Sequence, residues 1–175
     1  EEEPEVIDDG SGNTSDIAVT SLVDEYGITY ATISGYVNLN LLTSSGDTPG
    51  IGVELDIIKM TDEGEKAQSF GSQTTKELVG RKFVVDFTGL SGGSKFQYRT
   101  FVKSGGMTYY GEYRTLTTKD FTNLTSTGDA TDITFTSVNI TSSVNKKSIN
   151  EKESLGIGIA YSLEKTKLHP DSTFS

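Results

Sequence analysis

Three tyrosines close together, Tyr109, Tyr110 and Tyr113, have the clearest potential for binding chemistry in this chain. Neighbouring residues of a β-strand point to opposite faces of the sheet, so at most one of Tyr109 and Tyr110 can enter a core unless Gly111 marks a bulge. The other ring is then exposed and able to stack on a sugar or to anchor a protein partner. The alternative is ordinary packing against cross-strand neighbours.

Groups suited to catalysis are sparse. The single histidine, His169, follows a polar stretch and precedes Pro170, where solvation is the simplest expectation. Asp62 and Glu63 could in principle supply the two carboxyl groups of a glycosidase, but in an acidic chain of small modules we expect them to lie in a solvated loop. The chain has no nucleophile-elbow motif, and its lack of Cys excludes thiolate nucleophiles and Cys-based metal sites. We therefore expect a non-enzymatic protein with no catalytic residues, no metal and no cofactor.

The charge of the chain narrows the choice of partner. Its 15 Lys and Arg residues against 25 Asp and Glu residues give a net charge of −10, which repels nucleic acid and anionic membrane surfaces. No run approaches the roughly 20 apolar residues that a membrane-spanning helix needs. The expected partner is a protein or a glycan.

The elements that would position these side chains centre on residues 83–118. Three alternating apolar runs there, Phe83–Phe87, Phe96–Val102 and Met107–Leu116, are separated by Gly-rich turns, which predicts three antiparallel strands. The middle run has two distinct faces. One face carries Phe96, Tyr98, Thr100 and Val102, and the other carries Gln97, Arg99, Phe101 and Lys103.

Upstream residues predict further strands over 16–22, 28–39 and 51–58, with residues 61–73 as a short edge strand or loop in which Phe70 is tucked inward. On the second of these strands Tyr30 and Tyr36 face outward, with the same two interpretations as the tyrosine cluster. About seven strands in roughly 100 residues is typical of an all-β, immunoglobulin-like antiparallel sandwich. The expected core positions on the upstream strands are Ile17, Val19, Ala31, Ile33, Gly35, Val37, Leu39, Ile51, Val53, Leu55 and Ile57.

The segment Gly89–Arg99 resembles the corner between the fifth and sixth strands of fibronectin type III modules, where Leu90 would precede the corner aromatic by six residues. Tyr109–Glu112 followed by Thr115–Thr118 looks like the last strand of such modules in surface lipoproteins of gut Bacteroidota. The chain departs from that pattern in having Phe96 at the corner instead of Tyr, and in having no Trp. We expect the missing volume to be filled by Phe83, Phe87, Phe96 and Tyr98.

Internal repetition indicates a second copy of the same module. Four segments recur in the same order and at nearly constant separation, namely Ile28–Tyr30 with Ile133–Phe135, Ile33–Asn38 with Ile140–Asn145, Gly50–Val53 with Gly156–Ile159, and Phe70 with Phe174. The second copy has no counterpart of residues 83–118. A half sandwich exposes apolar faces and should not fold alone, so the natural chain either continues or receives the missing strands from another chain.

The predicted organisation has four parts. They are a disordered acidic tail (1–15), a complete β-sandwich module (16–118), a linker (119–128) and a partial second module (129–175). The resemblance implies an exported cell-surface lipoprotein, bound to the membrane only through a lipid anchor that this chain does not include. It would act as a spacer or adhesive module. Two alternatives remain: a filament or appendage subunit completed by strand exchange, and a carbohydrate-binding module of a glycan-utilisation system.

Overall fold

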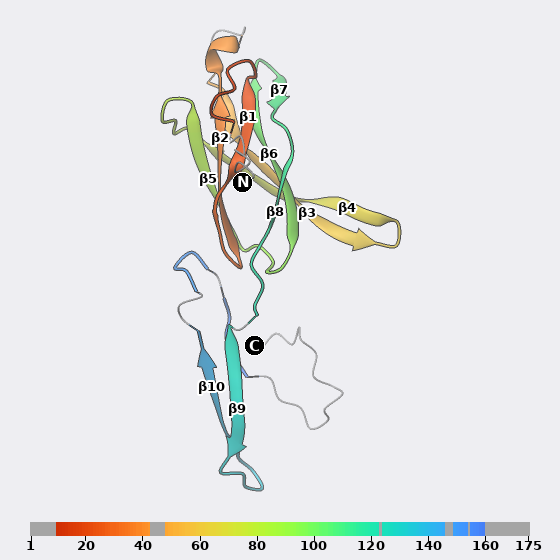
Figure 1. Ribbon diagram of the computed structural model, residues 1–175, viewed down its shortest axis with the longest axis vertical. Coiled ribbons are helices and arrows are strands. Elements are labelled where there is room, and N and C mark those ends of the chain that lie inside the picture. Colours follow the sequence, from red (N-terminus) through yellow and green to blue (C-terminus); the bar gives the residue numbers. More distant parts are fainter. Residues whose placement is uncertain (1–9, 43–47, 123, 146–148, 154, 160–175) are drawn as a thin grey trace, which may run out of the picture.

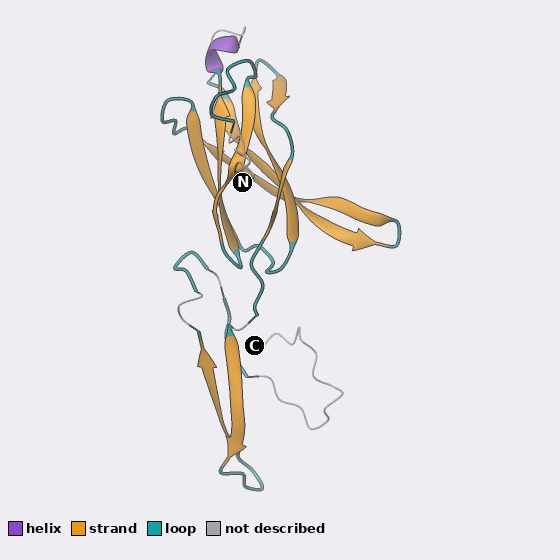
Figure 2. Cartoon of the chain, in the orientation of Figure 1, coloured by secondary structure: helices purple, strands orange, loops and turns teal. Residues whose placement is uncertain are grey.

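The computed structural model describes residues 10–42, 48–122, 124–145, 149–153 and 155–159. Within this part of the chain the structure consists of strands, turns and one short 3₁₀ helix (Figures 1 and 2). The elements are β1 (Ala18–Tyr26), β2 (Tyr30–Val37), η1 (Leu39–Leu41), β3 (Gly50–Thr61), β4 (Gly64–Thr75), β5 (Lys82–Thr88), β6 (Lys95–Ser104), β7 (Met107–Tyr110), β8 (Arg114–Thr117), β9 (Thr125–Thr131) and β10 (Asn139–Val144). No helix among the described residues is long and apolar enough to cross a membrane.

Strands β1 to β8 form two antiparallel sheets. One sheet has the order β1–β2–β5, and the other has the order β4–β3–β6, with β7 and β8 both paired to the far side of β6. This arrangement is an immunoglobulin-like β-sandwich with the strand order of a fibronectin type III module, which confirms the predicted fold class. Strands β7 and β8 together occupy the place of a single last strand.

The space between the sheets is filled by the side chains that the alternation assigned to it. Strand β5 shows the rule, because Phe83, Val85 and Phe87 are buried while Val84 and Asp86 are exposed. The core cluster comprises Ala18, Ala31, Ile33, Val37, Ile51, Val53, Leu55, Phe83, Val85, Phe87, Leu90, Phe96, Tyr98, Val102 and Leu116. The four aromatic residues expected to replace a central Trp are all in this cluster.

The corner aromatic Phe96 has no hydroxyl group and cannot donate a hydrogen bond to the backbone. Tyr98, two residues along the same strand, makes a hydroxyl-to-backbone bond. Its phenol donates a hydrogen bond of 3.1 Å to the carbonyl of Ser21 on the opposite sheet. Burial raises the pKa of Tyr98 to about 12, so the phenol remains a neutral donor at physiological pH.

Thr20 of β1 joins the two sheets along one side of the sandwich. Its hydroxyl accepts a hydrogen bond of 3.0 Å from the backbone N–H of Thr100 on β6, and its carbonyl accepts one of 2.9 Å from Nε of Arg114 on β8. Gly111 lies so close that an added Cβ would stand 2.7 Å from the Thr20 nitrogen. Strand β1 therefore closes this side of the molecule.

The hairpin of β3 and β4 differs from the expected short edge strand or loop. Strand β4 is twelve residues long and lies at the edge of its sheet, and Figure 1 shows the hairpin projecting sideways from the sandwich. Phe70 is only partly covered, with 41% of its surface exposed, and its ring meets the buried Phe96 edge-on at 5.8 Å. Most of β4 is exposed on both faces, so its sequence has no alternating pattern to reveal its length.

Residues 10–15, which fall within the range assigned to the acidic tail, are held against the sandwich by hydrogen bonds. The Asn13 carbonyl accepts hydrogen bonds from the guanidinium of Arg81 and from the side-chain amide of Asn38. These two donors come from separate parts of the first module, so long-range polar contacts fix a segment that has little apolar surface to bury. Residues 1–9 lie outside the described part of the chain.

Beyond the sandwich, β9 and β10 pair with each other as a separate two-stranded sheet, which Figure 1 shows below the sandwich. Strand β9 begins at Thr125, inside the range 119–128 that was assigned to a linker. The partial second module, 129–175, remains a prediction. His169 and Phe174 lie outside the described residues.

Candidate functional site

The three tyrosines of the predicted cluster, Tyr109, Tyr110 and Tyr113, differ in burial. The strand geometry places Tyr109 and Tyr110 on opposite faces of the sheet. Tyr109 packs against the core cluster, whereas Tyr110 and Tyr113 are each 46% exposed. The turn Gly105-Gly106, with positive φ at both residues, joins β6 to β7 in a two-residue hairpin. The resulting register places Tyr109 opposite the buried Val102 and Tyr110 opposite Phe101.

Arg99 brings the two exposed tyrosines into one cluster. Its guanidinium carbon lies 3.6 Å from the ring centroid of Tyr110 and 4.4 Å from that of Tyr113. Its Nε donates a hydrogen bond of 2.6 Å to Oε1 of Glu54 on β3. A cation held over an aromatic ring contributes about 0.5–1 kcal/mol at an exposed position. The arginine therefore restrains both rings, and Glu54 in turn restrains the arginine.

Neighbouring polar side chains extend this cluster across the outer face of the sheet. Gln97 of β6 donates a hydrogen bond of 2.9 Å to Oδ2 of Asp56 on β3. We call this surface the Tyr–Arg face, and it is defined by Glu54, Asp56, Gln97, Arg99, Tyr110 and Tyr113.

The surroundings of Tyr113 raise the pKa of its phenol above the ordinary value. Burial raises the pKa of its phenol, and the carboxylates of Glu54 and Asp56 raise it further, while Arg99 opposes them. The phenol is therefore a neutral hydrogen-bond donor at physiological pH. The face thus combines two half-exposed aromatic rings, one restrained cation and two carboxylates.

Arg99 is the member of this candidate site that the sequence analysis did not single out, although its strand and its outward face were both expected. The Gly-Gly turn sets the register that places Phe101 opposite Tyr110, and this signal was available in the sequence. The break in the last strand between Tyr110 and Arg114, which brings Tyr113 to the same guanidinium, carries no comparable signal.

The outward tyrosines of β2 differ from each other in the structure. Tyr36 is half-buried and its ring lies 5.9 Å from the guanidinium carbon of Arg81. Tyr30 is buried, with 3% of its surface exposed, and Nζ of Lys152 lies 5.7 Å from the centroid of its ring. Tyr30 is therefore unavailable for the binding role that the sequence left open.

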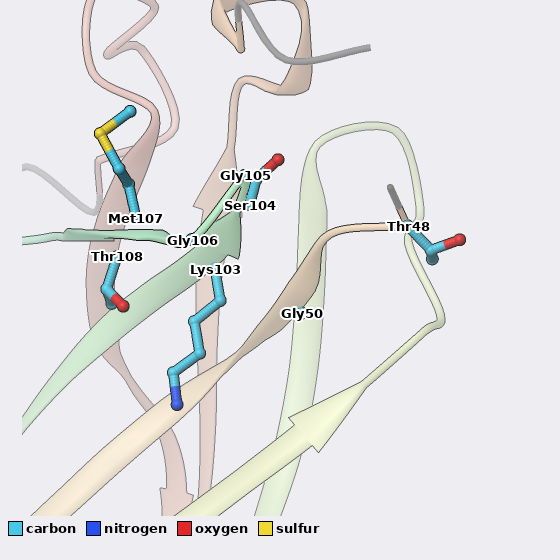
Figure 3. Close-up of a pocket in the computed structure, with 8 residues that line it drawn as sticks. All are labelled: Thr48, Gly50, Lys103, Ser104, Gly105, Gly106, Met107 and Thr108. Atoms are coloured by element: carbon cyan, nitrogen blue, oxygen red, sulfur yellow. The ribbon is translucent and has the colours of Figure 1, made fainter. Parts of the chain in front are cut away.

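A depression of about 490 Å³ beside the turn of β6 and β7 is lined by Thr48, Gly50, Lys103, Ser104, Gly105, Gly106, Met107 and Thr108. Figure 3 shows that the side chains of Thr48, Lys103 and Met107 point in different directions and do not meet. Such divergent groups do not define a ligand. Among the described residues, no three His, Cys, Asp or Glu side chains gather as a metal site would require.

Comparison with known proteins finds only distant structural neighbours. No family model and no curated protein matches the chain. Similar solved structures include the sensor domain of the anti-sigma factor RsgI4 in Pseudobacteroides cellulosolvens, with 14% identity, a TM-score of 0.40, and coverage of 88% of this chain and 98% of that one. Another is the fibronectin type III domain of human fibronectin type III domain containing protein 3, with 16% identity, a TM-score of 0.38, and coverage of 63% and 94%. At such values the neighbours carry no argument about function, and the fold assignment rests on the strand order.

Proposed function

We propose that this chain is a non-catalytic binding module, and that the Tyr–Arg face carries its ligand. One observation supports the proposal above the others: Arg99 contacts two half-exposed tyrosine rings at 3.6 and 4.4 Å. Rings held in this way lose little conformational entropy when a partner covers them, so more of the contact energy remains as affinity.

A protein is the partner that this composition fits best. Tyrosine and arginine are enriched at the energetic centres of protein–protein interfaces, where they pack in pockets that exclude water. The Tyr–Arg face places two tyrosines and one arginine in contact, with charged side chains beside them as a polar rim. A glycan stacked on Tyr110 is the second class of ligand, and a defined experiment separates the two.

The test compares variants of the full chain. Peptides selected from a phage-displayed library on the wild-type protein should bind Tyr110→Ala and Tyr113→Ala at least about tenfold more weakly, as expected for a truncated hot spot. Tyr36→Ala is the matched control, because it removes a tyrosine that also lies near an arginine but on the other sheet. Affinities are measured by biolayer interferometry, and circular dichroism verifies the fold.

The proposal fails if no selected peptide distinguishes the Tyr110 and Tyr113 variants from Tyr36→Ala. The same proteins are applied to a glycan array. Glycan binding that disappears in Tyr110→Ala, together with no discriminating peptide, would replace the protein partner with a sugar.

We further propose that the module is displayed at the cell surface, as a spacer or adhesive unit of an exported lipoprotein. The support is the resemblance of Tyr109–Glu112 and Thr115–Thr118 to surface modules and the acidic character of the N-terminal segment. A binding face carried on a β-sandwich, with the rest of the chain extending from one end, suits this placement.

A second candidate is a subunit whose partial module is completed by a neighbouring copy of the chain. Within the described residues, β9 and β10 pair only with each other, and every residue of β9 is exposed. Large apolar side chains nearby are exposed as well, including Ile133, Phe135 and Ile157. An isolated two-stranded sheet is marginally stable in water, so strands from another copy would stabilise it.

This candidate predicts self-association that depends on protein concentration. Sedimentation velocity should show oligomers growing with concentration for the wild type, and Phe135→Asp should suppress them by burying a charge in the interface. Val79→Asp, at an exposed position on the first sandwich, should leave them unchanged. A protein that stays monomeric at every concentration would eliminate this candidate.

A further inference from the structure

The turn between β1 and β2 binds a carboxylate from a distant part of the chain. Oε1 of Glu153 accepts a hydrogen bond of 2.7 Å from the backbone N–H of Ile28, and Oε2 accepts two more of 2.7 Å, from the backbone N–H and the hydroxyl of Thr29. Successive backbone N–H groups in a turn form a concave anion site, and hydrogen bonds to a charged acceptor are stronger than neutral ones.

The fit of this carboxylate depends on Gly27. A Cβ at that position would lie 2.1 Å from Oε1 of Glu153, so the absence of a side chain opens the approach to the backbone. Ile28, Thr29 and Tyr30 are all buried. The carboxylate thus accepts hydrogen bonds from the backbone N–H groups of two buried residues at this end of the sandwich.

The residues beside Glu153 match the charges around the turn. Nζ of Lys152 lies 3.4 Å from Glu25 and 3.7 Å from Asp86, and it donates a hydrogen bond of 3.1 Å to the hydroxyl of Thr32. The side-chain amide of Asn150 also donates to Glu25 at 3.3 Å. The backbone of the turn therefore binds the negative Glu153. The acidic side chains of β1 and β5 bind its positive neighbour, Lys152.

We propose that the β1–β2 turn is a docking surface for a Lys–Glu pair, and that its partner is the loop of the following module, here residues 149–153. Glu153 is the positioning residue of this junction, and it sets the orientation of the β9–β10 sheet relative to the sandwich. Figure 1 shows β9 and β10 beyond the end of the sandwich at which the β1–β2 turn lies. The surface shares no residue with the Tyr–Arg face, so this proposal stands independently of the proposed function.

The first test observes the hydrogen bonds directly in the full chain by NMR. In Glu153→Ala, the amide protons of Ile28 and Thr29 should move upfield and exchange with solvent at least about tenfold faster, because their acceptor is gone. Glu151→Ala is the matched control, since it removes the same charge from an exposed position of the same loop. Unchanged amide signals for buried Val53 would show that the sandwich is intact.

The second test measures the orientation. The chain contains no Cys, so spin labels at Val79→Cys on the sandwich and Phe135→Cys beyond it form a unique pair. The distance distribution from pulsed electron–electron resonance should be narrow in the parent and broad in Glu153→Ala, with Glu151→Ala resembling the parent.

Each result of these two measurements either supports or contradicts the proposal. Ile28 and Thr29 amides that are unaffected by Glu153→Ala would overturn the carboxylate site. Amides that change while the distance distribution stays narrow would overturn the claim that Glu153 sets the orientation. Thr29→Val probes the site from the sandwich side, and it should broaden the distribution less than Glu153→Ala because it removes one of three hydrogen bonds.

Discussion

Replacing Phe96 by alanine should lower the free energy of unfolding by about 4 kcal/mol, the usual cost of removing a large aromatic ring from a close-packed core. Phe96 has no exposed surface and lies on β6, in the centre of its sheet. The surrounding side chains belong to paired strands and cannot collapse into the space left by the ring. Chemical denaturation followed by fluorescence or circular dichroism gives the midpoint and slope that measure the loss.

Phe70→Ala is the matched control for this substitution. Phe70 touches the Phe96 ring edge-on at 5.8 Å but lies on the exposed edge strand β4, so its removal should cost less than about 1.5 kcal/mol. An equal loss from both variants would mean that β4 and its hairpin belong to the cooperative core, contrary to the exposure of that strand.

Gly52→Ala should destabilise the protein by about 3 kcal/mol, although it adds a single methyl group. An added Cβ would lie 2.1 Å from the carbonyl oxygen of Gln73 on β4 and 2.8 Å from the ring of Phe101 on β6. The obstacle on one side is backbone, which can yield only if β3 and β4 separate. Thermal unfolding monitored by calorimetry should show a clear fall in Tm.

Gly50→Ala, two residues earlier on the same strand, separates this clash from the general effect of replacing glycine. The nearest atom to an added Cβ there is Cβ of Lys103 at 3.6 Å, an ordinary contact. We expect its Tm to stay close to that of the wild type or to rise slightly, because alanine restricts the unfolded chain. A similar fall in both variants would contradict the explanation by close approach.

The sequence predicted the sandwich because the core positions of its central strands recur at every second residue. Strand β5 alternates strictly between core and surface, and on β6 the face of Phe96, Tyr98, Thr100 and Val102 is buried as expected, while Phe101 on the other face is buried as well. Where this alternation is missing, the sequence is less informative. Strand β4 is exposed on both sides, and residues 10–15 are held by polar contacts to Arg81 and Asn38 that no local pattern encodes.

The candidate site was predictable only in part, for the same reason. Alternation was sufficient to separate Tyr109 from Tyr110, since it depends on neighbours in sequence. The contact of Arg99 with both rings depends on strand register and on the break after Tyr110, which are tertiary features. The approach of Lys152 to the ring of Tyr30 joins residues more than a hundred positions apart, and it lies beyond any window of local sequence.

The attachment of β1 to β8 through Thr20 makes the two flanks of the sandwich different. On that flank the two sheets are linked by hydrogen bonds, which Thr100 and Arg114 donate to Thr20. The opposite flank ends in β4, whose outer hydrogen-bonding groups have no strand beside them in the described structure. A foreign polypeptide that lengthens the β4–β3–β6 sheet on this flank would therefore pair with β4, whose free edge is long.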